Sequence, residues 1–186
     1  MKTYSLNIEQ IPSVQGSFEY LGEENGKAFV RSKSKLKAPF VEEELPQSLQ
    51  DKLNAPLKEA KEAKITELNA ICDSLLKEFS STALGVEYIY DGSLEDQINL
   101  MSAINLGVDI PFRCRKPHSE SKENILHTKE QLAKVFSDGA SYKANIINQC
   151  GALKSYVGSL EDIESIERVS WESYKDIVKD TDEVTQ

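Results

Sequence analysis

The chain has 186 residues, 28% of them charged, and a net charge of −9, which disfavours a phosphate-backbone binder because such proteins need clustered Lys and Arg. Its 39% hydrophobic content is that of a folded protein with one domain, or a small domain and an appendage. No run approaches about 18 apolar residues, and the N-terminus lacks the apolar region of a signal peptide. We therefore expect no nucleic-acid partner and no membrane partner.

Three cysteines, Cys72, Cys114 and Cys150, lie far apart and form no Cys-x-x-Cys pair. An odd number of cysteines without a disulfide framework predicts reduced, buried thiols in a cytosolic protein. Cys72 and Cys150 fall on apolar helix faces, where core packing is expected. The pattern leaves open whether Cys114 faces inward or outward.

The N-terminal region predicts short strands over residues 3–8, 17–22 and 27–31. Asn25 and Gly26, between the last two, favour a hairpin turn because both residue types tolerate positive φ. These strands are too few to be stable alone, so we expect them to pack on another element or to pair with another chain. Pro39 and Pro46 bracket an acidic run that is typical of a linker.

A long helix is predicted from Pro56 to about Phe79, with one apolar stripe on a charged cylinder. A second helix, residues 129–153, should pack antiparallel against it and bury four side chains of the two stripes. These are Leu68, Leu75, Val135 and Ile146. Gly139 falls inside the second helix, where it costs about 1 kcal/mol relative to Ala, so a close crossing or a kink is expected there.

Between these helices, three segments predict strands: residues 86–90, 109–115 and 124–127. They could form a three-stranded antiparallel sheet. A helix over residues 94–106 places Leu94, Ile98 and Met101 on one face, and Gly107 is a suitable stop. The polar Asn105 continues that spacing, so this end should meet solvent.

The fold class that these elements predict is α+β: a mainly helical domain with a small antiparallel sheet, preceded by an N-terminal β-hairpin module. The expected boundaries are 1–45 for the hairpin module and linker, 46–174 for the helical domain, and 175–186 for a flexible tail. A short helix should begin at Ser159 and turn Ile163 and Ile166 inward.

Two helix starts carry capping patterns: Ser93 opens one helix, and Thr128 with Gln131 forms a capping box. We expect Asp96, Gln97 and Asn99 to tie the first turn after Ser93 to residues 79–84, as a structural network. The alternative is that these polar groups face outward and contact a partner.

Trp171, the single tryptophan, is either a core anchor or an interface anchor.

No pattern predicts a catalytic, cofactor or metal site, and we expect a protein that is not an enzyme. His118 and His127 have no ligand spacing around them, and His127 precedes the Thr128 cap, so a turn or cap role is expected. Glu95 and Asp96 open a helix, where the dipole favours anions without a metal.

Residues 64–171 resemble a phage tail-associated domain, a domain of unknown function found in tailed-phage and prophage proteins and often encoded beside tail-fibre genes. The resemblance rests on KITELNAICDSLL, FSSTALGVEYIYDGSLEDQINL, GVDIPFRC, HTKEQLAKVFSDGASYK and SLEDIESIERVSW, in this order and spacing. It brings no catalytic residues with it.

The resemblance implies a non-enzymatic tail-fibre assembly factor with chaperone-like action, or a tail accessory factor. Its partner would be a tail-fibre or other tail protein, and it would work in the host cytoplasm during assembly. Association into a homo-oligomer is compatible with this role. Two alternative functions remain open: a structural baseplate or fibre-tip component of the virion, and an acidic inhibitor of a host nucleic-acid enzyme. The last is motivated by the net charge of −9.

Overall fold

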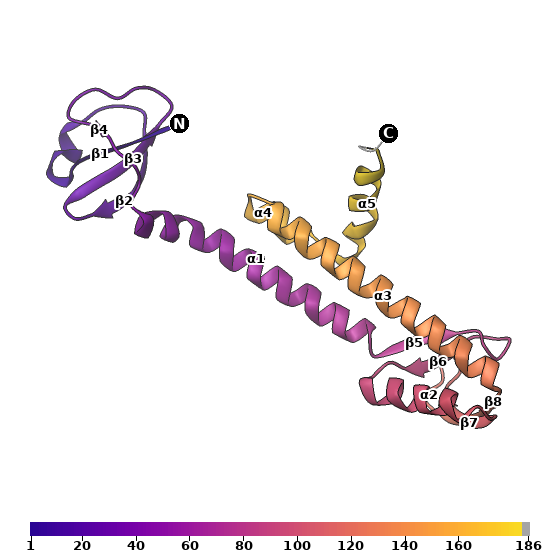
Figure 1. Ribbon diagram of the computed structural model, residues 1–186. Coiled ribbons are helices and arrows are strands. Elements are labelled where there is room, and N and C mark those ends of the chain that lie inside the picture. Colours follow the sequence, from indigo (N-terminus) through magenta and orange to yellow (C-terminus); the bar gives the residue numbers. More distant parts are fainter. Residues whose placement is uncertain (184–186) are drawn as a thin grey trace. The chain divides into compact units, whose positions relative to one another are not determined.

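The computed structural model describes residues 1–183, and the side chains of residues 1–178. The chain divides into two compact units, Met1–Ala60 and the part from Lys61 onward, with the boundary inside helix α1, Gln47–Leu75. The first unit is built on an antiparallel sheet, and the second is mainly helical with two small antiparallel sheets (Figure 1). The predicted α+β class is confirmed.

The first unit holds a four-stranded sheet in the order β2-β3-β1-β4. The predicted hairpin is confirmed: its turn residues, Asn25 and Gly26, have φ angles of 50° and 75°. The fourth strand, which pairs with β1, lies inside the segment that the sequence predicted as a linker. The strands are β1 (Lys2–Asn7), β2 (Glu19–Glu24), β3 (Lys27–Ser32) and β4 (Val41–Glu42).

Helix α1 has different ends from those predicted. It begins at Gln47 and runs through Pro56, which the sequence placed at its first turn. A proline inside a helix removes one backbone hydrogen bond, and α1 continues on both sides of it. The helix ends at Leu75, so that Phe79 lies in a strand instead of the last turn.

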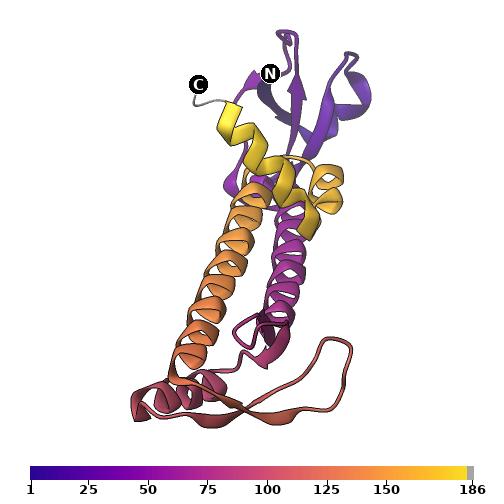
Figure 2. The ribbon, with the colours of Figure 1, turned by 90° about the vertical axis from the view of Figure 1, so that its right-hand side faces the viewer.

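The C-terminal half of α1 packs against α3, Lys129–Ser159, in the predicted antiparallel sense (Figure 2). Three contacts between the helices fix this direction: Lys61 Nζ donates to Gly158 O at 2.7 Å, Cys150 Sγ lies 3.9 Å from Leu68 O, and Tyr142 Oη donates to Leu75 O at 3.2 Å.

Of the four side chains that the two helix stripes were predicted to bury, Leu68, Val135 and Ile146 are buried and Leu75 is half-buried. Val135 packs with strands and α2 and belongs to a different cluster from Ile146, so its predicted place in the α1–α3 seam is wrong.

Two separate two-stranded sheets replace the predicted three-stranded one. Strand β5 (Glu78–Ser81), which the sequence did not predict, pairs with β6 (Tyr88–Asp91). Strand β7 (Ile110–Cys114) pairs with β8 (Glu123–His127), as predicted. A single bridge between Ile89 and Arg115 connects the two sheets.

Helix α2, Leu94–Leu106, lies against the N-terminal half of α3. Both predicted ends are confirmed: Ser93 Oγ accepts a hydrogen bond from the Asp96 amide, and Gly107 has a φ of 71°. The face that packs is different from the one we expected, because Leu100 and Ala103 are buried while Leu94, Ile98 and Met101 are exposed.

The C-terminal segment contains α4, Ile163–Arg168, a 3₁₀ turn at Trp171–Ser173, and α5, Tyr174–Glu183. The predicted start of this short helix at Ser159 is wrong, because α3 continues to Ser159 and Asp162 caps α4 instead. Ile166 is buried as predicted, whereas Ile163 is exposed. The segment predicted as a flexible tail is helical as far as Glu183, and residues 184–186 lie outside the described residues. Within the described chain, no helix has the length and apolar character to cross a membrane.

Candidate functional site

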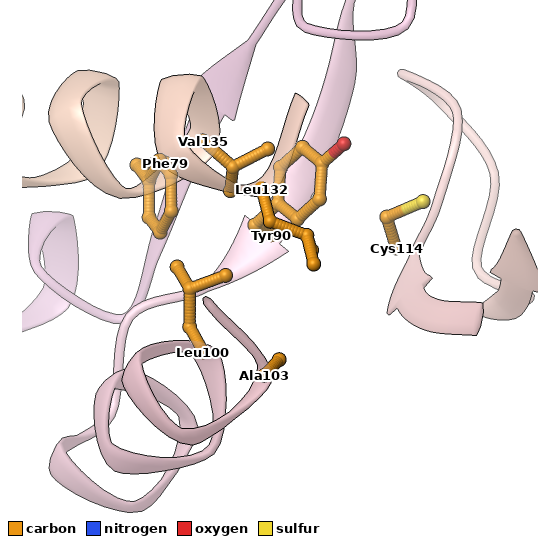
Figure 3. Close-up of a cluster of buried hydrophobic side chains, with 7 residues drawn as sticks. All are labelled: Phe79, Tyr90, Leu100, Ala103, Cys114, Leu132 and Val135. Carbon is orange, nitrogen blue, oxygen red and sulfur yellow. The ribbon is translucent and has the colours of Figure 1, made fainter. Parts of the chain in front are cut away.

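The core of the second unit lies where α2, α3 and the small sheets meet. One cluster of buried side chains joins β5, β6, α2, β7 and α3 (Figure 3). The rings of Phe79 and Tyr90 stack with their centroids 5.7 Å apart. The rings of Tyr90 and His127 pack edge to face, with their centroids 5.8 Å apart. The cluster consists of Phe79, Tyr90, Leu100, Ala103, Cys114, Leu132 and Val135.

Gly139 explains how α3 comes close to this core. A Cβ atom at this position would lie 2.8 to 3.1 Å from the Phe79 ring, which is closer than side chains pack. The element packed against Gly139 is strand β5, so the close helix crossing that the sequence offered as one explanation is wrong.

A cavity of about 450 Å³ opens beside this cluster, between α2, α3 and the strands β5 and β6. We call it the α2–α3 groove. Phe79, Tyr90 and Leu100 lie at its base, and Leu94, Phe136 and Ile147 belong to its lining. Its volume and its mostly apolar lining are those of protein sites that receive a ligand or an apolar side-chain cluster.

Three exposed apolar side chains line the groove. Leu94 on α2 is 72% exposed, and Phe136 and Ile147 on α3 are 39% and 48% exposed. Ile98 and Met101 on α2 are also exposed, at 54% and 49%, but do not belong to the lining. We call the α2–α3 groove with Leu94, Phe136 and Ile147 the apolar face; exposed apolar surface of this kind marks interaction sites.

The predicted polar residues at the start of α2 lie at the edge of this groove. Gln97 Nε2 donates to Gly92 O at 2.7 Å, and Lys143 Nζ donates to Gln97 Oε1 at 3.4 Å. Asp96 accepts a hydrogen bond from the Ser93 hydroxyl, while Asn99 is exposed. The predicted ties to residues 79–84 are therefore wrong: Gln97 closes the turn before its own helix, and Asp96 supports its cap.

Trp171 is half-buried and packs against a cluster of Cys72, Ile146 and Cys150. Its carbonyl oxygen accepts a hydrogen bond from Gln149 Nε2 at 3.0 Å. This placement supports the core-anchor alternative for Trp171. All three cysteines are free and buried, as the sequence predicted, and Cys114 is among the most buried.

His127 is a buried residue for which the sequence predicted only a turn or cap role. Its side chain is 0% exposed, directly behind Tyr90 and Phe112, which line the groove. Nε2 lies 2.8 Å from Tyr90 Oη and Nδ1 lies 2.7 Å from Ile125 O. Burial lowers the pKa of His127 below its ordinary value.

Paired charges connect the two small sheets on the side of Asp91. Arg115 Nη2 lies 2.5 Å from Glu78 Oε2, and Lys122 donates to Asp91. These four side chains are partly exposed, so the pairs contribute modestly to stability. Asp91 is thus paired with Lys122, while Asp96 lines the groove at the start of α2, where Lys143 Nζ also reaches Gln97.

The fold and the site together define an α+β protein whose helical unit presents an apolar groove. Among the described residues, no group of three or more His, Cys, Asp and Glu side chains is placed to hold a metal ion. Comparisons of the chain with known protein families, curated proteins and solved structures found no match.

Proposed function

We propose that this chain is a non-enzymatic binding protein of phage tail assembly, which holds an apolar segment of a tail protein in the α2–α3 groove. The observation that carries the proposal is the apolar face. Covering apolar surface is worth about 25 cal/mol per Å², so the exposed Leu, Ile and Phe side chains that line one groove favour an occupant. Assembly factors act in this way when they cover an apolar segment of a partner until the partner is incorporated into the particle.

The resemblance to phage tail-associated domains supplies the kind of partner. The segments that carry it contain most of the residues that form the apolar face, from Leu76 to Lys143. A tail-fibre or other tail protein is therefore the proposed partner.

Charge near the groove narrows the partner segment further. Asp96 lines the groove, and the exposed Glu95 stands next to it at the start of α2. The whole chain has a net charge of −9. An apolar segment with a Lys or Arg beside its anchoring residues would match this end of the groove, and charge complementarity would set its direction.

Co-expression with tail-fibre and other phage tail proteins tests the proposal. A tagged chain should retain its tail-protein partner, and Ile147→Glu should reduce the retained amount at least tenfold by placing a charge on the exposed lining of the groove. Leu126→Glu is the matched control, because Leu126 is 62% exposed on β8 and does not line the groove.

Equal retention by Ile147→Glu and the native chain would contradict the proposal, as would fibre folding and infectivity that survive deletion of the gene. Mass spectrometry of purified particles then separates an assembly factor, which should be substoichiometric or missing, from a baseplate or fibre-tip component, which should be present in stoichiometric amounts.

A further inference from the structure

Two of the three cysteines meet in the seam between α1 and α3. Cys72 lies on α1 and Cys150 on α3, and both belong to one small buried cluster with Ile146. The third cysteine, Cys114, lies in a different cluster, at the end of β7. The seam therefore brings together two thiols that are far apart in the sequence and leaves the third thiol alone.

The direction of the side chains turns these two thiols toward each other. On an α-helix every Cα–Cβ bond is tilted toward the N-terminus, so Cys72 leans toward the turn that contains Leu68. Cys150 Sγ lies against this same turn, 3.9 Å from Leu68 O and 3.9 Å from Asn69 Oδ1. Because α3 runs antiparallel to α1, Cys150 leans in the opposite direction along the seam, which is toward Cys72.

The two thiols lie just below the surface. The exposed fractions of Cys72 and Cys150 are 7% and 3%, whereas that of Cys114 is 1%. Asn69 is exposed, and Lys154 Nζ donates to its Oδ1 at 3.1 Å, which places a cation near the pair. Burial raises the pKa of Cys72, the Cys150 thiol adds to the rise, and Lys154 opposes it. Cys72 is therefore protonated at neutral pH, so that its oxidation is slow and should be faster at alkaline pH.

We propose that Cys72 and Cys150 are an oxidisable pair, which hydrogen peroxide converts into a disulfide that joins α1 to α3. Cys72, the more exposed thiol, attacks one oxygen of the peroxide and becomes a sulfenic acid, with release of one water. Cys150 then attacks the sulfenic sulfur, so that the S–S bond forms and a second water leaves. The two sulfur atoms lose two electrons, and the peroxide takes up these electrons and the two thiol protons.

The disulfide stiffens the second unit, because it joins the two longest helices and closes a loop of about 80 residues. A closed loop restricts the unfolded chain, so the oxidised protein should unfold at a higher temperature than the reduced protein. In a reducing compartment the thiols stay free, as they are in the structure. The bond therefore forms when the chain enters an oxidising environment, and this inference does not rest on the proposed function.

Thiol counting and peptide mapping on the full chain test the link. After treatment with hydrogen peroxide and unfolding, only the Cys114 thiol should remain free, and mass spectrometry of the digested chain should find the Cys72 peptide joined to the Cys150 peptide. Cys114→Ala is the matched control and should form the same link, because Cys114 lies in a different cluster. Cys150→Ala should form no link within the chain, and circular dichroism confirms that each variant is folded.

Trp171 provides a second measurement on the folded chain, because the single tryptophan packs against this cluster. A disulfide next to an indole ring quenches its fluorescence. The emission of Trp171 should therefore fall on oxidation and recover when dithiothreitol reduces the bond. Cys114→Ala should keep this reversible response, and Cys150→Ala should lose it.

Several outcomes overturn the proposal. Three free thiols after prolonged treatment would show that the pair does not react. A disulfide that involves Cys114, or one that joins two chains, would show that Cys72 and Cys150 are not partners. A sulfinic acid on Cys72 without a link would show that Cys150 cannot reach the oxidised sulfur. An oxidised chain that melts no higher than the reduced chain would overturn the stiffening of the second unit.

Discussion

His127 occupies the most restricted environment among the titratable side chains near the groove. A carbonyl oxygen can only accept, so the contact with Ile125 O places the imidazole proton on Nδ1. Nε2 then accepts a hydrogen bond from the Tyr90 hydroxyl. The neutral ring satisfies both of its nitrogen atoms, whereas a charged ring would be buried against the rings of Tyr90 and Phe112.

This arrangement predicts that stability falls in mild acid. Because the pKa of folded His127 lies below the value of about 6.5 in an unfolded chain, the unfolded state binds more protons below that pH. The free energy of unfolding should therefore be highest above about pH 6.5 and should decline as the pH falls toward the lowered pKa of the folded state. Thermal melts between about pH 5.5 and 7.5 measure this slope.

His127→Gln tests whether this residue causes the slope, and His118→Gln is the control, because His118 is exposed. Removing His127 should flatten the decline, and removing His118 should preserve it. The carboxylates with lowered pKa, such as Asp138, titrate below this range and add little to it. An unchanged slope in His127→Gln would contradict the prediction.

At the residue scale, what could be predicted from sequence depended on how far away the partner residue lay. The partner of Ser93 is three residues away, and its cap was predicted. Tyr90, the partner of His127, is 37 residues away. For Gly139 the sequence indicated a close approach without identifying Phe79, because that contact exists only after α3 has folded over β5.

At the level of elements, turns and caps were predictable, while extents and pairings were not. The hairpin turn and the capping box of α3 depend on neighbouring residues alone. Phe79 continues the apolar spacing of α1, so the pattern extended the helix; tertiary pairing with Tyr90 makes this segment a strand instead. The sequence pattern indicated the apolar stripe of α2, but periodicity cannot distinguish a buried apolar face from an exposed one.

The first turn of α2 allows a test that separates structure from binding. Ser93→Ala should lower the free energy of unfolding by about 0.5–2 kcal/mol, since it removes the hydrogen bond to the Asp96 amide. Gln97→Ala should also lower it, because Gly92 O loses its donor. Asn99→Ala should leave the melting temperature unchanged, because Asn99 is exposed.

Thermal melts followed by circular dichroism, with retention of the proposed tail protein measured on the same variants, decide whether these side chains stabilise the fold or bind the partner. Loss of retention by Asn99→Ala at an unchanged melting temperature would extend the binding surface along α2. A fall in the melting temperature of Asn99→Ala equal to that of Ser93→Ala would contradict the assignment of Asn99 to the surface.

At the scale of the whole chain, each unit has hydrophobic clusters of its own, which explains why the sequence pattern indicates two modules. In the first unit the sheet buries Tyr4, Leu6, Ala28 and Val30 on one side. In the second unit the cluster around Phe79 and Leu132 holds α2 and α3 together. A unit of about 60 residues buries only about 60% of the surface of its unfolded chain, so the first unit should be marginally stable.

Matched leucine truncations in the two cores should therefore destabilise different parts of the chain. Leu6 and Leu132 are 3% and 0% exposed, and each Leu→Ala change should cost about 2–5 kcal/mol. Because no side chain of one core belongs to the other, Leu6→Ala should speed amide hydrogen exchange within residues 1–60 and leave residues 61–178 protected. Leu132→Ala should do the reverse. Exchange measured by mass spectrometry resolves the two regions, and equal acceleration along the whole chain in both variants would show that the units unfold together through α1.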